Sequence, residues 1–413
     1  MLSEEEHNNS LISDKKTSSK SINWKRNLII ISIAQFLTMV GMSSVIPFMP
    51  IFVKELGITN QAEASVWSGL IFAGPYFLSI IATPLWGVLG DKYGRKQMLV
   101  RALFGLSLAV LLMGFSQNVY QLFALRVLQG AISGMIAAAL AFVSANTPSE
   151  KSGYAIGILQ SSLSAGNIVG PFAGGIISDI TGIRSVFYLV SFLTFISAIL
   201  IIFFVKELKN KDAKITEFSI INNFKYAVNN KEIRFILLLI ILSQAGINYT
   251  SPIFPFFIEI LHAPAQYLST ITGSLIAIIG IMSVIFAPYW GKRNDKKDYK
   301  KTVRISNLII GLMMLLHTIV PNYIYLYPIR TISGIFFAAV LPSLYTGLNR
   351  LTPLDNKGGV MGIASSANLV GQLLGYSTCG FVASWFGFDI TFIISSILLF
   401  AVSLLIRRKV KKV

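Results

Sequence analysis

The chain has 413 residues, of which 54% are hydrophobic and 13% are charged. A soluble domain carries about twice that share of charged residues, so the composition predicts an integral membrane protein rather than a soluble one. The net charge of +17 also occurs in nucleic-acid-binding proteins, but the positions of the basic residues, given below, indicate a membrane protein with no nucleic-acid partner.

Twelve apolar stretches dominate the sequence. Each is near the ~20 residues that a helix needs to cross the hydrocarbon core of a membrane. We therefore predict an all-α integral membrane protein with twelve transmembrane helices. The stretches lie near residues 27–52, 65–89, 97–116, 119–145, 153–178, 184–205, 233–258, 266–290, 303–320, 322–349, 358–384 and 387–406.

The predicted helices form two groups of six, at residues 27–205 and 233–406, joined by a charged cytoplasmic linker at residues 206–232. Residues 1–26 are polar and predict a disordered cytoplasmic arm, since the apolar stretch after them is too long for a signal peptide. Residues 407–413 form a basic cytoplasmic tail.

The basic residues indicate the orientation of the chain. All but four of the 35 lysine and arginine residues fall on the side of both termini, whereas Lys54 and Arg184 lie outside and Arg126 and Arg330 lie within helices. Short cytoplasmic loops carry the excess of basic residues. We therefore predict a multi-pass protein of the inner (plasma) membrane with both termini cytoplasmic, and a secondary attraction to anionic membrane lipid.

Residues typical of metal or cofactor sites are scarce. The single cysteine, Cys379, cannot form an internal disulfide, the three histidines are far apart, and no glycine-rich phosphate-binding loop is present. We expect no cofactor, no metal and no enzymatic activity. Cys379 is predicted to lie in the outer half of the eleventh helix, which starts on the cytoplasmic side near residue 358.

The two groups of helices repeat each other at an offset of 204 or 205 residues. The segment PLWGVLGDK at residues 84–92 recurs as PYWGKRNDK at 288–296, and PFMPIFV at 47–53 recurs as PIFPFFI at 252–258. Arg126 corresponds to Arg330, and Gly157, Gly166 and Gly170 have glycine mates near the same offset. The repeat predicts two pseudo-symmetric six-helix halves.

Three motifs of the first half resemble those of the major facilitator superfamily, over residues 25–408. The loop GVLGDKYGRKQ matches its G-x-L-x-D-[RK]-x-G-[RK]-[RK] pattern, and ALRVLQGAISG resembles its helix 4 motif, with Arg126, Gln129 and Gly130 in place. GNIVGPFAGG is similar to the helix 5 motif of the drug:proton antiporter branch. The second half departs from these patterns, since GQLLGYSTCG has no proline. The antiporter motif residues are Gly166, Gly170, Pro171, Gly174 and Gly175.

The charged loop after the second helix is interpreted as a conformational latch. A carboxylate gains free energy at a helix N-terminus. In such a family Asp91 would face the start of the eleventh helix, and Asp295 the start of the fifth, when the cytoplasmic side is closed. The alternative is a solvated loop that only fixes topology. The predicted latch residues are Gly87, Asp91, Gly94, Arg95, Lys96 and Asp295.

The fifth helix carries small residues four apart, which let a neighbouring helix approach closely, and Pro171 can bend it locally. A rigid packing seam without influence on the direction of transport is the alternative. Arg126 is costly within a membrane, so we expect either a functional role or an arginine bonded to helix carbonyls. No acid lies in the middle of a predicted helix, which leaves Asp91, Arg126 and His317 as proton-site candidates.

Polar and aromatic residues in the middle of the predicted helices fall on single faces. They would line a cavity for amphipathic organic molecules, cationic ones included, although interhelical hydrogen bonding is the alternative for each amide. The cavity candidates are Gln35, Met39, Ser43, Gln160, Asn167, Gln244, Asn248, Phe336, Asn368, Gln372 and Tyr376.

The resemblance implies a secondary transporter that exports amphipathic molecules by proton antiport, with alternating access to a central site. Its expected partners are a small-molecule substrate and protons, and it is expected to act as a monomer. A dedicated exporter of one metabolite, such as a siderophore or lipid precursor, is the runner-up, and a nutrient importer is the third hypothesis. A membrane sensor on a transporter fold would keep the packing glycines but would not need Asp91.

Overall fold

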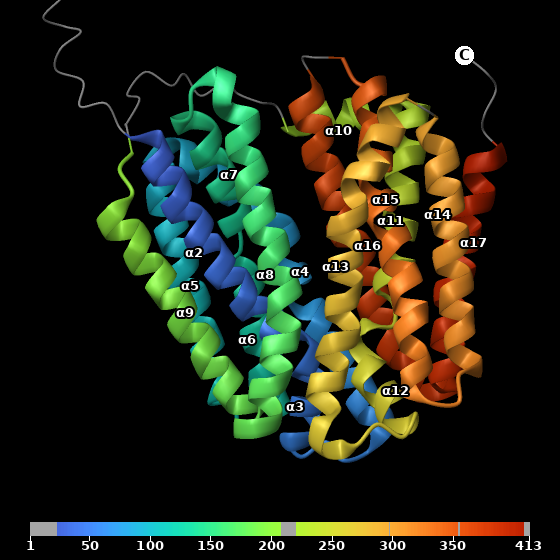
Figure 1. The fold of residues 1–413 in the computed structure, drawn as a ribbon. Helices are drawn as coiled ribbons and strands as arrows, with labels where there is room; N and C mark the ends of the chain where they lie inside the picture. Colours follow the sequence, from blue (N-terminus) through green and yellow to red (C-terminus); the bar gives the residue numbers. More distant parts are fainter. Residues whose placement is uncertain (1–22, 208–219, 297, 354–355, 409–413) are drawn as a thin grey trace, which may run out of the picture.

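The computed structural model describes residues 23–207, 220–296, 298–353 and 356–408, and this part of the chain is helical almost throughout. The side chains of Asp91 and Asp295 and the surroundings of Gly87, all three in the predicted latch, lie outside the described residues. Figure 1 shows two bundles side by side. The first residues of the described chain, α10 and the end of α17 share one end, here named the terminal end; α3 and α12 lie at the opposite end.

The first bundle contains the helices up to residue 204. They are α2 (Trp24–Val45), α3 (Met49–Glu55), α4 (Gln61–Tyr93), α5 (Arg95–Gly114), α6 (Val119–Ile132), α7 (Met135–Asn146), α8 (Ser152–Thr181) and α9 (Ile183–Phe204). The second bundle contains α10 (Ile220–Asn229), α11 (Lys231–Asn248), α12 (Phe254–Ile260), α13 (Leu268–Lys296), α14 (Tyr299–Leu316), α15 (Leu326–Leu351), α16 (Lys357–Phe386) and α17 (Phe388–Arg408).

Single residues set several helix ends. The Asn60 side chain accepts hydrogen bonds from the N–H groups of Ala62 and Glu63 and so begins α4, as a capping asparagine does. Gly94 adopts a φ of 106°, which side-chain-bearing residues rarely adopt. This one glycine ends α4 and lets α5 begin at the next residue, Arg95.

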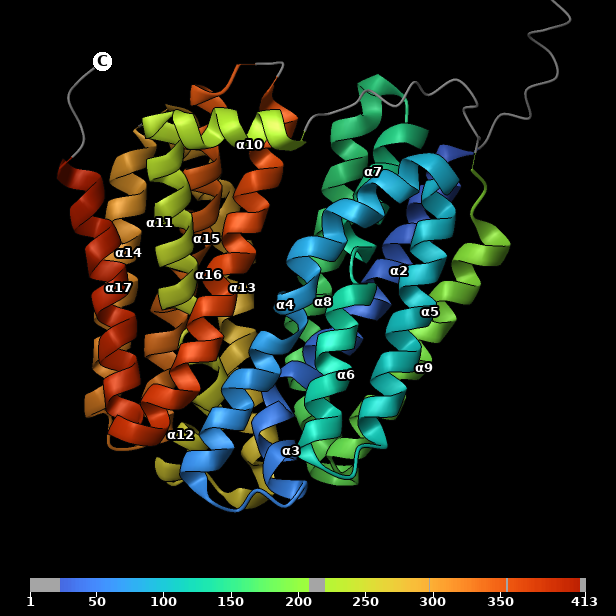
Figure 2. The same cartoon turned by 180° about the vertical axis from the view of Figure 1, so that it is seen from behind.

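Ten helical segments of the described chain are long and apolar enough to cross a membrane. The other two long helices, α8 and α16, have 30 residues each and run alongside them (Figure 2). Both are rich in glycine and serine, which suits helices that pack closely against the other bundle. The predicted all-helical membrane fold in two halves is confirmed.

The prediction of a single helix at residues 119–145 is wrong in one respect, because the structure divides this segment into α6 and α7. Gly134 has a φ of 120° and interrupts the hydrogen-bonded ladder. Nearby carbonyls find other donors: Trp86 Nε1 lies 2.7 Å from the oxygen of Ala131 and Arg101 Nη2 lies 3.4 Å from that of Ser133. The repeat-related helix α15 is continuous, so only the first bundle carries this break.

Each bundle has its own apolar core, with Leu103 and Phe142 among the fully buried residues of the first and Leu344 and Phe392 among those of the second. The two bundles pack against each other mainly through α4 with α16 and α8 with α13. The helix α10, within the predicted linker at residues 206–232, crosses the terminal end of the second bundle and contacts α16.

Candidate functional site

The bundles contact each other tightly toward the opposite end. A Cβ atom at Gly69 of α4 would lie 2.8 Å from the carbonyl oxygen of Tyr376 in α16, and one at Gly380 would overlap that of Ser65. The second pair of helices is equally close, because a Cβ at Gly273 of α13 would overlap the carbonyl of Pro171 in α8. Backbone therefore lies against backbone at both contacts, with no room for a side chain between the helices.

The predicted antiporter motif packs in two directions. Gly166, Gly170 and Gly174 lie against α2, where the Ser43 and Ser44 hydroxyls donate to the carbonyls of Gly166 and Gly170, at 3.0 and 2.9 Å. Pro171 and Gly175 instead face α13 in the other bundle. The motif thus joins α8 both to its own bundle and to the other one.

A polar network crosses between the bundles near the middle of the molecule. The Tyr76 hydroxyl of α4 donates to Gln372 Oε1 of α16 at 2.7 Å, and Gln372 Nε2 donates to Asn368 Oδ1 at 3.0 Å. Tyr376 lies beside Tyr76, with 5.6 Å between ring centroids, and donates to Asn248 Oδ1 of α11 at 3.3 Å. Gln372, Asn368, Tyr376 and Asn248 are all cavity candidates from the sequence, and the structure brings them together.

The other cavity candidates lie in different surroundings. Gln35 is fully buried and donates to the carbonyl of Leu159, joining α2 to α8. Phe336 packs on Trp290 inside the second bundle, with 5.5 Å between ring centroids. Gln160 and Asn167 on α8 are exposed. Met39 and Ser43 of α2 face the glycines of α8, and Gln244 accepts a hydrogen bond from Asn248.

Arg126 of α6 is buried and well bonded. Its Nε donates to the carbonyl of Ile71 at 3.0 Å, and Nη1 donates to Gln129 Oε1 at 2.8 Å, one helical turn away. Gly130 allows this packing, since a Cβ there would overlap the carbonyl of Pro75. The three residues of the helix 4 motif therefore hold α6 against α4.

Arg330, the repeat mate of Arg126, has no equivalent partners among the described residues. Ser333 stands where Gln129 stands in the first half, and its hydroxyl donates to Ile329. The Arg330 guanidinium lies 3.7 Å from the ring centroid of Phe254, and its Nε has no hydrogen-bond partner in the described part of the chain. His317 is also buried and stacks on Phe392, with 4.8 Å between ring centroids, so it lies inside the second bundle.

Toward the terminal end the bundles separate (Figures 1 and 2). A Cβ at Gly153 or Gly157 of α8, at Gly291 of α13 or at Gly362 of α16 would have no described atom within 4 Å. These helices are the ones that touch the other bundle at the opposite end. The space beside these glycines at the terminal end is here named the cleft, and toward the opposite end it stops at the polar network and the glycine contacts.

The described latch residues at the start of α5 are held by an acid that the sequence did not reveal. Glu207, just after α9, accepts hydrogen bonds from the N–H groups of Arg95 and Lys96 at 2.9 and 3.0 Å. The Arg95 guanidinium donates to the carbonyl of Ala141 at 2.7 Å, and Lys96 Nζ to that of Ile202 at 2.8 Å. The position of Glu207 beside a helix N-terminus could have been suspected only from the fold.

Two polar contacts across the bundles at the opposite end were also missed. Asp179 at the end of α8 accepts hydrogen bonds from the N–H groups of Ser269 and Thr270, at 3.1 and 2.7 Å, at the start of α13. Lys54 Nζ lies 2.7 Å from Glu259 Oε2. Lys54 and Glu259 are repeat mates at an offset of 205. Opposite charges at repeat-related positions could have predicted this contact from the sequence.

The chain is similar to known proteins over most of its length. The family model described as Major Facilitator Superfamily matches residues 31–284 and 236–412. "Multidrug resistance protein MdtG" from Proteus mirabilis (strain HI4320) is 33% identical over 383 residues, covering 91% of this chain and 94% of that protein. The MdtG protein of Klebsiella pneumoniae (strain 342) is 30% identical, covering 91% of each chain.

A solved structure of a mutant of the nucleoside transporter NupG has the same fold. It superimposes with a TM-score of 0.79 and covers 93% of this chain and 100% of that chain, at 12% sequence identity.

Proposed function

Because this chain belongs to the major facilitator superfamily, we propose that it is an exporter of amphipathic organic molecules that works by proton antiport. It is a multi-pass membrane transporter, and its similarity to MdtG proteins over 91% of its length supports multidrug efflux. Support for antiport comes from the helix 5 motif around Pro171. We place it in the inner membrane as a monomer, with the terminal end cytoplasmic because the basic residues gather there.

The observation that carries the proposal is the cleft closed by the network of Tyr76, Gln372, Tyr376 and Asn248. Tyrosine rings and uncharged amides together suit a molecule with apolar and polar parts. The network joins residues of both bundles, so a substrate that displaces its hydrogen bonds would act on the contact between the bundles. That coupling is what alternating access requires.

The charged residues inside the bundles indicate which charge the proposed substrates carry. Arg126 and Arg330 are buried inside the two bundles, while the acidic residues of the described chain lie at or near helix ends. A cationic substrate would find no described carboxylate with which to pair in the middle of the bundles, whereas an anion is attracted to a guanidinium. We therefore propose that neutral and anionic molecules are preferred over cations.

Transport by purified protein in proteoliposomes tests these proposals. In vesicles with the terminal end outward, an imposed inside-acid gradient should drive uptake of an anionic or neutral fluorescent amphiphile more strongly than uptake of ethidium. A protonophore should abolish uptake, and vesicles without protein are the control. Uptake driven only by a sodium gradient would mean that sodium, and not the proton, is the coupling ion. Transport of a single metabolite and of no other molecule would favour a dedicated exporter.

The latch remains part of the proposal for the opposite phase of the cycle. When the terminal end closes, Asp91 is proposed to meet the start of α16 and Asp295 the start of α8, whose N-termini attract carboxylates. Asp91→Asn should abolish transport in the same vesicles while membrane abundance stays at the wild-type value. Normal transport by this variant would leave the loop with a topological role only.

A further inference from the structure

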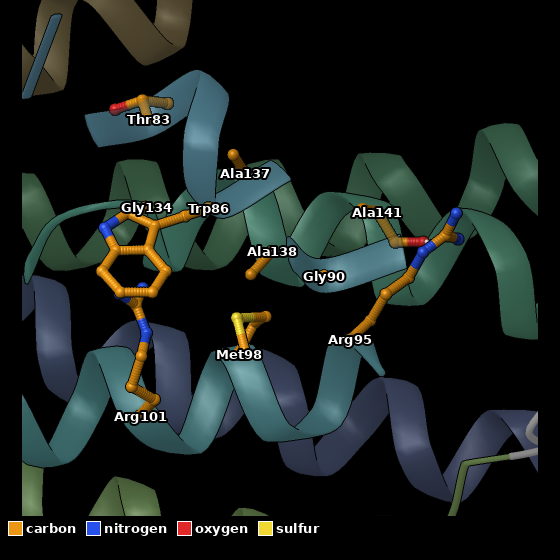
Figure 3. A pocket seen from close by; sticks show the side chains of 10 residues that line it. All are labelled: Thr83, Trp86, Gly90, Arg95, Met98, Arg101, Gly134, Ala137, Ala138 and Ala141. Atoms are coloured by element: carbon orange, nitrogen blue, oxygen red, sulfur yellow. Dashed lines mark hydrogen bonds between the residues drawn. The ribbon is translucent and has the colours of Figure 1, made fainter. Parts of the chain in front are cut away.

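A second cavity lies within the first bundle, away from the cleft between the bundles. Its volume is about 310 Å³, at the lower end of the range for small-molecule sites. Residues of α4, α5 and α7 and the adjoining Gly134 line it (Figure 3): Thr83, Trp86, Gly90, Arg95, Met98, Arg101, Gly134, Ala137, Ala138 and Ala141. The lining residues therefore combine two guanidinium groups with an apolar wall.

The internal repeat allows the wall of this cavity to be compared with the corresponding positions of the second half. Ala137, Ala138 and Ala141 of its wall correspond, at an offset of 204, to Leu341, Pro342 and Tyr345 in the second half. Larger side chains thus occupy the positions that are alanine in the first half. The small side chains of this cavity wall are therefore a feature of one half and not a consequence of the shared fold.

Arg101 gives the cavity its charge. Its guanidinium lies 3.3 Å from the ring centroid of Trp86, and its Nε has no hydrogen-bond partner among the described residues. None of the ten lining residues is acidic. Arg95 lies at the other end of the cavity, six residues before Arg101 and so about 9 Å along the same helix (Figure 3). A cation of this kind in a low-dielectric cavity attracts an anion.

The depth of the cavity points to the source of that anion. Arg101 lies about 9 Å beyond the start of α5 at the terminal end, close to the lipid headgroup region of the leaflet on that side. Two turns further along the same face of α5, Leu108 is 57% exposed, which provides an apolar surface for acyl chains. Basic pockets between transmembrane helices on the cytoplasmic side bind anionic lipid headgroups.

We propose that this cavity binds the phosphate headgroup of one anionic phospholipid from the leaflet at the terminal end. The phosphate lies against Arg101, while Met98 and the three alanines pack on the glycerol region. This inference is independent of the transported substrate, because the cavity is separate from the cleft and is formed by α4, α5 and α7 of one bundle. Failure of the transport proposal would leave it intact.

Native mass spectrometry of the purified full-length protein tests the proposal. With added phosphatidylglycerol, the wild type should retain one lipid more strongly than it retains phosphatidylcholine with the same acyl chains. Arg101→Ala should weaken this binding about fivefold, the effect of removing one arginine near anionic lipid. Arg101→Lys, which keeps the charge, should retain most of it. Ala138→Leu, which fills the cavity and leaves Arg101 in place, should also reduce it.

A matched control separates this site from general attraction to basic residues. Arg293 lies over Trp290 in the second half, with 5.6 Å from its guanidinium carbon to the ring centroid, and it is not among the residues that line the cavity. Arg293→Ala should bind phosphatidylglycerol as the wild type does. Equal binding by wild type, Arg101→Ala and Ala138→Leu would overturn the proposal, as would equal retention of phosphatidylcholine. Displacement of the lipid by millimolar inorganic phosphate would assign the site to a soluble anion instead.

Discussion

At the scale of single residues, the pair of Lys54 and Glu259 shows how a repeat can hold two halves together. Positions related by pseudo-symmetry meet near the symmetry axis, where identical charges would repel each other. Here the two halves carry opposite charges 2.7 Å apart. The side chains are 29% and 48% exposed, so the pair contributes at most ~1 kcal/mol to the contact between the bundles.

Reversing one of these charges should open the opposite end. In Lys54→Glu two carboxylates face each other, and we expect the population closed at that end to fall by up to about fivefold. The double variant Lys54→Glu, Glu259→Lys should restore the wild-type distribution. Spin-label distances between α3 and α12 measure the populations. A double variant that stays as open as the single one would contradict the role assigned to the pair.

Asp179 should stabilise the closed contact at the opposite end more than Lys54 does. Its carboxylate accepts two backbone hydrogen bonds at the start of α13, and hydrogen bonds to a charged group contribute about 1.5–3 kcal/mol each. Asp179→Ala should therefore shift the same spin-label distances further than Lys54→Ala does. Asp389→Ala, which removes an exposed acid at the same end, is the control. A shift no larger than that control's would show that the contact is unimportant.

At the scale of helices, α8 combines two kinds of glycine. A Cβ at Gly170 would overlap the Ser43 hydroxyl, whereas a Cβ at Gly157 meets no described atom within 4 Å. Gly157→Leu should therefore fold normally, with a gain of up to ~1 kcal/mol in helix propensity, yet block closure of the terminal end. Gly170→Leu should instead lower the melting temperature, because overpacking costs about 1–3 kcal/mol.

Melting temperature and transport, measured on the same two variants, separate these effects. The expected pattern is a stable but inactive Gly157→Leu protein and a destabilised Gly170→Leu protein. An active Gly157→Leu protein would mean that α8 does not approach α13 at the terminal end during transport.

The helices themselves could be predicted from the sequence, whereas most contacts between them could not. Apolar length located the spans to within a few residues, because the need to cross lipid acts on each helix separately. The break at Gly134 was missed, since a glycine there is also typical of a packing residue. Glu207 and Asp179 were missed because their partners are backbone N–H groups of another helix, which leave no side-chain pattern. The network around Tyr376 was found in part, since its amides share helix faces.

At the scale of the whole molecule, the orientation in the membrane can be tested with the two ends of α8. Cys379 is fully buried and is the single cysteine of the sequence. The variant Cys379→Ser therefore has no native thiol that could compete for the label. In that background, an impermeant maleimide applied to intact cells should label Thr181→Cys and not Glu150→Cys, because both positions are exposed but lie at opposite ends. The reverse result would invert the topology derived from the basic residues.

The break between α6 and α7 also implies that the two halves differ in stiffness. In the second half, α15 stays helical for 26 residues, although Pro342 within it removes one backbone hydrogen bond. In the first half, the ladder of hydrogen bonds stops at Gly134, which leaves a joint braced by the side chains of Trp86 and Arg101. We therefore expect the bending that accompanies each cycle to be larger at Gly134 in the first half than at Pro342 in the second.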